Sequence, residues 1–201
     1  MSGESRLATE PGEGGVVRRV VLVGFMAAGK SVVGKTLARR LGWSFYDVDS
    51  EAAASAGAPV AEIFARAGET AFRRLEAELA AQALGRDRVV IATGGGWPRN
   101  RWSGWPRLPP GTLSVWLAVS ARECVRRARA DGLALRPVLS AGDPVARAEE
   151  LLAARVSAYR EASVHVHTDG QDPDDIARRI ARLVCEDPAP SSDPSGGTNG
   201  G

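Results

Sequence analysis

An apolar run that ends in a glycine-rich turn constrains the fold of this chain more than any other feature. Residues 16–23, VVRRVVLV, predict a strand whose second half is buried on both faces. The pattern G-x-x-x-x-G-K-S follows directly, from Gly24 to Ser31, and a helix is predicted from about Gly29 to Leu41. A strand, this turn and a helix in succession are the context in which the pattern binds the phosphates of a nucleotide.

The residues of the turn fit the chemistry of a phosphate loop. Its backbone N–H groups can surround a phosphate, and the N-terminus of the following helix adds positive potential. Lys30 would reach the outer phosphates, and the Ser31 hydroxyl would bind magnesium. The chain holds two lysines against 24 arginines, so a lysine here indicates a need for a slim, mobile charge. No tract that selects guanine is found in the sequence, which favours ATP.

Strands and helices alternate along the rest of the chain. Further strands are predicted in WSFYDVD, RVVIA, GTLSVWLAV and VHVHT, which begin at residues 43, 88, 111 and 164. Helices are predicted in PVAEIFARAG, in ETAFRRLEAELAAQALG, after a capping Ser120, in DPVARAEELLAARVSAYREA and in DPDDIARRIARLVC. This order predicts an α/β fold, a three-layer sandwich around a five-stranded parallel sheet. Ligands of such sheets bind beyond the carboxyl ends of the strands.

Acids and glycines follow the predicted second and third strands. Asp47 and Asp49 end the second strand, where one could face a metal and the other a substrate. The alternative is that Asp49 caps a helix. Gly94, Gly95 and Gly96 end the third strand, either as a plain loop or as a close backbone approach to a ligand.

Three arginines stand out, although each also has a plain structural explanation. Arg73 is expected to pair with Glu76, which lies one helical turn away. Arg136, in LRPVL, is typical either of a mobile lid or of a solvated loop. Arg160 lies near the end of a predicted helix, where a cation is favoured by the helix dipole.

Taken together, five tracts of the chain resemble the shikimate kinases, a family within the nucleoside-monophosphate-kinase-like group of P-loop folds. The tracts are GFMAAGKSVVGKTLARRLGWSFYDVD, IFARAGETAFRRLE, IATGGG, RPVL and YREAS, and they follow the family's order between about residues 20 and 183. The resemblance implies ATP-dependent phosphorylation of the 3-hydroxyl of shikimate, a step toward chorismate and the aromatic amino acids. It also implies magnesium as the cofactor.

The resemblance implies a role for each candidate residue. ATP would be bound by Ala27, Ala28, Gly29, Lys30, Ser31, Val32, Arg127, Arg136 and Gln171. Shikimate would be bound by Asp49, Phe64, Phe72, Arg73, Gly94, Gly95, Gly96 and Arg160, with the two arginines on its carboxylate. Magnesium would be held by Ser31 and, through water, by Asp47. Lys30, Asp49 and Arg136 would be catalytic, with Asp49 placed to accept the proton of the reacting hydroxyl.

Length, charge and composition limit the domain organisation, the partners and the location that can be expected for this chain. The 201 residues predict one domain at 16–185, with a lid at about 130–143, between loose tails at 1–15 and 186–201. The net charge of +2 does not indicate a nucleic-acid partner. The chain has two cysteines without CxxC spacing, no apolar leader and no apolar run of about 20 residues. These features predict a cytoplasmic protein without a membrane partner. The resemblance suggests a monomer.

Two segments depart from the family pattern. Residues 97–111, WPRNRWSGWPRLPPG, contain three of the five tryptophans. They could form a surface loop packed on the next helix, an altered pocket edge or a partner patch. The predicted lid carries fewer charges than expected, which leaves Arg136 largely alone.

Three alternative functions remain open at this stage. A gluconate-type kinase is disfavoured because Asp49, Arg73, the three glycines and Arg160 occur together. A non-catalytic nucleotide- or shikimate-binding regulator would be expected to lack Lys30, Asp49 or Arg136. A nucleoside-monophosphate kinase would need a tract that recognises a nucleobase, and none is found in the sequence.

Overall fold

The computed structural model describes residues 16–100, 105, 108–130 and 143–185. The two predicted tails lie outside these residues, as do Arg136 and residues 131–142 of the predicted lid. Within the described ranges, no helix is both long and apolar enough to cross a membrane.

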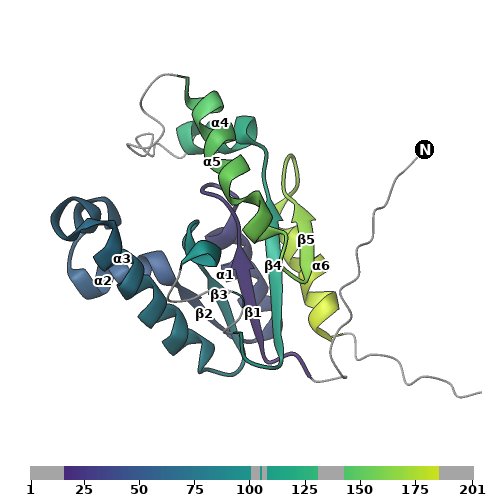
Figure 1. The fold of residues 1–201 in the computed structure, drawn as a ribbon. Coiled ribbons are helices and arrows are strands. Elements are labelled where there is room, and N and C mark those ends of the chain that lie inside the picture. The colour runs from purple at the N-terminus through teal and green to yellow at the C-terminus, as the bar shows by residue number, and fades with distance from the viewer. Residues whose placement is uncertain (1–15, 101–104, 106–107, 131–142, 186–201) are drawn as a thin grey trace, which may run out of the picture.

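A five-stranded parallel sheet forms the centre of the molecule (Figure 1). Its strands are β1 (Arg19–Val23), β2 (Ser44–Asp47), β3 (Val89–Ala92), β4 (Thr112–Ala118) and β5 (Val164–His167), in the order β2-β3-β1-β4-β5. Each neighbouring pair is parallel, so the predicted sheet is confirmed. All five carboxyl ends therefore meet at one edge.

Helices cover both faces of the sheet and complete the predicted three-layer sandwich. They are α1 (Lys30–Leu41), α2 (Val48–Ala56), α3 (Val60–Leu84), α4 (Ala121–Ala130), α5 (Pro144–Tyr159) and α6 (Pro173–Cys185), with a 3₁₀ turn, η1 (Trp97–Arg99). Helices α1 and α6 pack side by side on one face, while α3 and α5 lie on the other (Figure 1). Right-handed crossovers on this strand order require that division.

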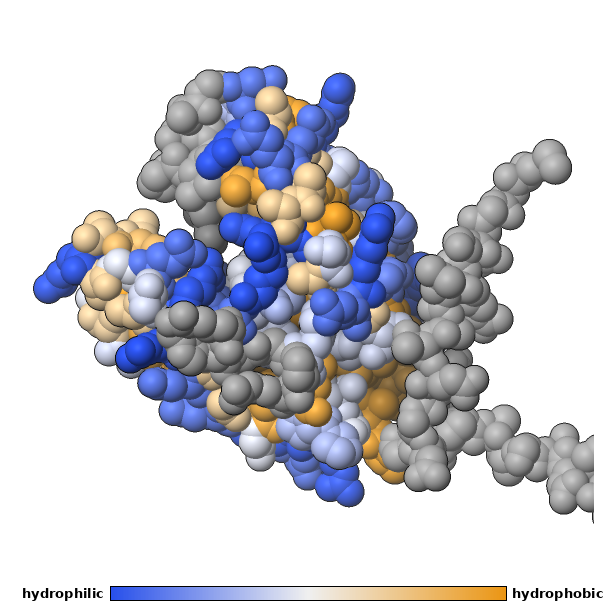
Figure 2. Space-filling model, in the orientation of Figure 1, coloured by the Kyte–Doolittle hydropathy of each residue, from blue (hydrophilic) through white to orange (hydrophobic). Residues whose placement is uncertain are grey.

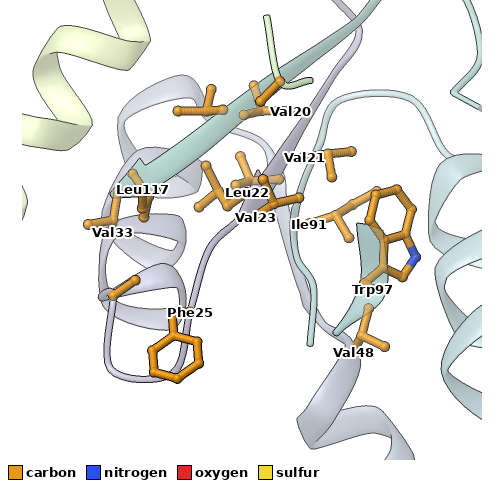
Figure 3. Packing of buried hydrophobic residues seen from close by; sticks show 14 of the residues in the cluster. Val20, Val21, Leu22, Val23, Phe25, Val33, Val48, Ile91, Trp97 and Leu117 are labelled. Carbon is orange, nitrogen blue, oxygen red and sulfur yellow. The ribbon is translucent and has the colours of Figure 1, made fainter. Parts of the chain in front are cut away.

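Strand β1 runs through the middle of the core, which explains its unbroken apolar sequence. Residues Val20–Val23 are fully buried, because helices cover both of its faces (Figure 3). The strand begins at Arg19 rather than at Val16. The Arg19 guanidinium is itself buried and donates to the carbonyls of Arg86 and Pro110, which fixes the start of the strand.

Local sequence signals explain where several helices begin. Asp143 caps α5 by accepting from the Val145 N–H, and Ser120 caps α4 by accepting from the Glu123 N–H, as predicted. Helix α3 was expected as two helices. The structure joins them in one run with a break at Gly68, whose φ of 79° and ψ of 167° lie outside the helical region.

Candidate active site

The phosphate loop connects β1 to α1 and lies at the carboxyl edge of the sheet. Gly24 has a φ of 148°, and a Cβ there would lie 2.5 Å from the Leu117 carbonyl oxygen of β4. Gly29 has a φ of 91° and directly precedes α1. Glycine is therefore required at Gly24 by both backbone conformation and space, and at Gly29 by conformation.

Lys30 occupies the first position of α1 and turns back over the loop. Its Nζ donates to the carbonyls of Gly24 and Phe25, each at 2.9 Å. The ammonium is thus held beside the loop backbone, where the outer phosphates of a bound nucleotide would lie. This placement agrees with the role predicted for a compact, mobile cation.

Asp47 makes two contacts that connect the loop to the second strand. One carboxylate oxygen accepts from the Ser31 hydroxyl at 2.5 Å, and the other accepts from the Ser50 N–H at 3.2 Å. The helix cap suggested for Asp49 is therefore made by Asp47, and α2 begins one residue earlier than Asp49. A hydroxyl and a carboxylate in contact are oxygen donors of the kind that magnesium prefers.

Arg127 fastens α4 to the same loop. Its guanidinium donates to the carbonyls of Ala27 and Thr168 and is paired with Glu123 at 2.8 Å. The remaining residues predicted to bind ATP are more spread out: Ala28 is buried under the loop, whereas Val32 and Gln171 are exposed. Arg127 therefore lies beside the phosphate loop, and its contact with ATP stays a prediction.

The three successive glycines form a tight turn at the end of β3. The Trp97 N–H donates to the Gly94 carbonyl at 3.1 Å, which closes the turn. Gly96 has a φ of −102° and a ψ of −3°, a conformation that any residue adopts. Space favours glycine at two of the three positions: a Cβ at Gly94 would lie 2.1 Å from Glu76 Oε1, and one at Gly96 would lie 2.6 Å from Arg73 Nη2.

The glycine turn also lies close to the phosphate loop. A Cβ built on Gly95 would lie 3.6 Å from the Gly24 carbonyl oxygen and 3.7 Å from the Met26 nitrogen. Asp49 Oδ1 lies 3.0 Å from the corresponding position of Gly94. In the described part of the chain, the N–H groups of Gly95 and Gly96 donate to no protein acceptor. Two backbone donors thus lie close to the loop, and the Asp49 carboxylate lies beside them.

Arg73 is held at this turn by a buried carboxylate. Its Nη1 donates to Glu76 Oε2 at 2.9 Å, and Glu76 is fully buried. Burial raises the pKa of Glu76, whereas the Glu76 and Glu69 carboxylates raise the pKa of Arg73 against the opposing effect of burial. The guanidinium lies 5.7 Å and 5.6 Å from the ring centroids of Phe64 and Phe72. The predicted Arg73–Glu76 pair is confirmed, and both phenylalanines support it.

The second arginine at the turn is Arg155 rather than Arg160. Arg155 Nη1 lies 3.5 Å from the Gly95 carbonyl oxygen, and its guanidinium carbon lies 5.5 Å from the centroid of the Phe25 ring. Arg160 ends α5, is exposed, and contacts the His165 ring through its backbone carbonyl. The structure therefore places Arg155, rather than Arg160, beside the glycine turn.

The Trp-rich segment packs against α5 where it is described. Trp97 is fully buried and lies on the same side of the core as Ile91 and Val48 (Figure 3). Trp105 meets it edge to face, with ring centroids 5.7 Å apart, and donates to the Ala158 carbonyl at 2.6 Å. These residues pack on α5 rather than on the next helix along the chain, α4, and Trp97 lies in the core rather than on the surface.

Comparison with known proteins assigns the family. The shikimate kinase family model matches residues 26–185. A shikimate kinase from Symbiobacterium thermophilum is 43% identical over 168 residues, which are 83% of this chain and 96% of the relative. The chain belongs to the shikimate kinase family.

Solved structures agree with this family assignment. A shikimate kinase from Acinetobacter baumannii, determined in complex with shikimate, matches with a TM-score of 0.75 and 32% identity over 84% of this chain and 93% of that one. A gluconokinase from Sinorhizobium meliloti matches with a TM-score of 0.51 and 18% identity over 84% of this chain and 94% of that one, which shows the shared fold alone.

Sequence reasoning missed three members of this family site. Arg155, Tyr159 and the buried Glu76 carboxylate all contact the glycine turn or its arginine. A signal for the first two was available, because Arg155 and Tyr159 are four residues apart and share one face of a helix. The i, i+3 spacing of Arg73 and Glu76 was noted, but it does not distinguish a surface pair from a buried one.

Proposed function

We propose that this chain transfers the terminal phosphoryl group of ATP to the 3-hydroxyl of shikimate, giving shikimate 3-phosphate and ADP. The observation that carries the proposal is the closeness of the phosphate loop and the glycine turn: a Cβ built on Gly95 would lie 3.6 Å from the Gly24 carbonyl oxygen. Phosphoryl transfer needs a donor and an acceptor in line and a few ångströms apart. Two neighbouring backbone sites, one suited to phosphates and one to a polar acid, meet that need.

The nucleotide side rests on the loop and on the cations around it. The loop N–H groups and the start of α1 would hold the phosphates, and Lys30 would follow the charge that moves during transfer. The carbonyl contacts of Arg127 with Ala27 and Thr168 support a position beside the bound nucleotide. Ser31 and Asp47 would hold magnesium together with phosphate oxygens and water, and the ion would neutralise charge between the phosphates.

The acceptor side rests on a carboxylate, two guanidiniums and two backbone donors. Arg73 and Arg155 approach the glycine turn, and planar guanidiniums match the carboxylate of shikimate. Asp49 Oδ1 lies 3.0 Å from the Cβ position of Gly94 and, unlike Glu76, Asp49 is not fully buried, so it would bind the reacting hydroxyl and take its proton. Figure 2 shows the surface hollowed between the end formed by α2 and α3 and the end formed by α4 and α5.

A coupled assay of ADP release tests this function. Purified protein is supplied with ATP, magnesium and shikimate, next to parallel reactions with gluconate, AMP or no acceptor. Asp49→Asn should abolish shikimate-dependent release while ATP binding persists, because the amide cannot accept the hydroxyl proton. Glu51→Gln is the matched control: Glu51 lies on the same turn of α2 but is exposed, so turnover should be retained.

Two outcomes would contradict the proposal. Wild-type protein that binds ATP but releases no more ADP with shikimate than without it is not a shikimate kinase. Faster release with gluconate or AMP than with shikimate would name a different acceptor.

A further inference from the structure

Tyr159 reaches the glycine turn from a fully buried position on α5. Its side chain is 0% exposed, and its hydroxyl donates to the Gly95 carbonyl oxygen at 2.5 Å. Burial raises the pKa of Tyr159 to about 12, so the hydroxyl keeps its proton at neutral pH and acts as a donor.

This hydrogen bond fixes the orientation of the peptide between Gly95 and Gly96. The carbonyl and the N–H of a planar trans peptide point in opposite directions. When Tyr159 holds the Gly95 carbonyl toward α5, the Gly96 N–H is turned away from α5. That N–H has no protein acceptor in the described ranges, so it is oriented and available for a ligand.

The Tyr159 ring is restrained by an aromatic contact and by the docking of its helix. The ring stacks on Trp116 of β4 with centroids 5.9 Å apart and an angle of 25° between the planes. Behind it, α5 is docked on the Trp-rich segment: Trp105 donates to the Ala158 carbonyl at 2.6 Å, and Arg99 donates to the Ala154 carbonyl at 2.7 Å. Helix α5 and the glycine turn therefore form one packed unit.

Arg155 lies on the same face of α5, one turn before Tyr159, and its guanidinium reaches the same Gly95 carbonyl at 3.5 Å. The Tyr159 hydrogen bond thereby sets the separation between the Arg155 guanidinium and the backbone donors of the turn. We propose that Tyr159 is a positioning residue for the acceptor substrate, which aligns the Gly95–Gly96 peptide and Arg155 without touching the substrate. This inference rests on the function proposed above.

The test compares steady-state kinetics of Tyr159→Phe with those of wild type. The variant keeps the stacked ring and leaves the Gly95 carbonyl without its tyrosine donor. The KM for shikimate should rise roughly 5- to 30-fold, the range expected for one buried hydrogen bond. The KM for ATP should stay unchanged, because the loop contacts of Lys30 and Arg127 are untouched.

Thr112→Val provides a matched control. Thr112 also donates a hydroxyl to a backbone carbonyl, that of Pro109 at 2.7 Å, but at the opposite end of the sheet. This variant should keep both wild-type KM values. If Tyr159→Phe melts below the assay temperature, Trp105→Phe serves as the second variant. It removes the donor to Ala158 and should raise only the KM for shikimate.

Two results would overturn the inference. One is a KM for shikimate equal to that of wild type, and the other is an equal rise in both KM values, which would indicate general loosening. Failure of the proposed function would look different, because wild-type ADP release would then not depend on shikimate at all.

Discussion

Arginine and lysine serve different tasks in the site of this chain. Lys30 lies over the phosphate loop as a compact ammonium held by two backbone carbonyls. Arg73 and Arg155 present planar guanidiniums at the glycine turn, each supported by an aromatic ring or a carboxylate. A moving phosphoryl group is best followed by a point charge, whereas a fixed carboxylate is best held by a fork of donors.

The assignment of the second arginine gives a prediction for single residues. Arg155→Lys should raise the KM for shikimate by roughly 10- to 100-fold, because a lysine loses the paired hydrogen bonds to a carboxylate. Arg160→Lys should leave it unchanged, since Arg160 is exposed at the end of α5. Initial-rate kinetics of the two variants at saturating ATP decide the matter. The opposite pattern would restore the assignment made from sequence.

Residue roles were predictable where the motif itself fixes the geometry. The positions of Lys30 and Ser31 could be predicted, because the spacing of the phosphate loop determines where each side chain points. The choice between Arg155 and Arg160 could not be predicted in this way, because five residues along a helix turn the side chain by about 140°. Only the packing of α5 on the glycine turn settles which of the two faces inward.

Helix α4 holds the phosphate loop through a small charged network. Glu123 pairs with both Arg126 and Arg127, and Arg127 in turn binds the loop carbonyl of Ala27. The hydrogen bond from Arg126, together with that from Arg127, lowers the pKa of Glu123 to about 2 against the opposing effect of burial. The stability of this element should therefore depend on pH.

The pH dependence can be predicted for this element. Since the folded pKa lies below the ordinary glutamate value of about 4.3, the ionised carboxylate stabilises the folded state at neutral pH. Glu123→Gln should lower the Tm by a few degrees at pH 7. The difference should shrink as the pH falls from about 4.3 and vanish near a pH of about 2.

Thermal melts across this range measure the effect. Glu150→Gln is the control, because its pair with Arg147 is largely exposed and should contribute little. A Glu123→Gln difference that does not change with pH would contradict the ionic explanation.

Element boundaries were less predictable than the elements themselves. The apolar run of β1 and the alternation of strand and helix signals were sufficient to predict the order of the elements along the chain. The start of α2 could not be predicted, because the sequence DVD is also typical of a strand end. The structure shows that the Asp47 side chain caps the helix there. The burial of Trp97 was hidden for a related reason. A tryptophan after a glycine turn looks like a loop residue unless the packing against Ile91 and Val48 is known.

For the molecule as a whole, two ligand sites with separate residues predict that ATP and shikimate each stabilise the protein when added alone. ATP at about 100 times its Kd should stabilise wild type by about 2.7 kcal/mol, seen as a rise in Tm. Lys30→Met should lose most of that rise and keep the rise produced by shikimate. Lys35→Met is the control, since this other lysine is exposed on α1, 6.0 Å from the Phe45 ring centroid, and should keep both rises. An intact ATP response in Lys30→Met would remove the lysine from the nucleotide site.

The parallel sheet and its three layers were predictable because strand and helix signals alternate without ambiguity. The strand order β2-β3-β1-β4-β5 could not be derived from spacing alone, since several orders satisfy right-handed crossovers. That order is what places the end of β3 next to the end of β1.

Adjacency of β1 and β3 has a thermodynamic consequence. A Cβ built on Gly95 would come within van der Waals distance of Gly24 and Met26, so the two backbones are close enough for a shift of one to affect the other. The two substrates would then not bind independently: whatever factor ATP applies to the affinity for shikimate, shikimate must apply to the affinity for ATP. The closeness of two glycine-rich segments thus makes donor and acceptor reciprocal effectors of each other.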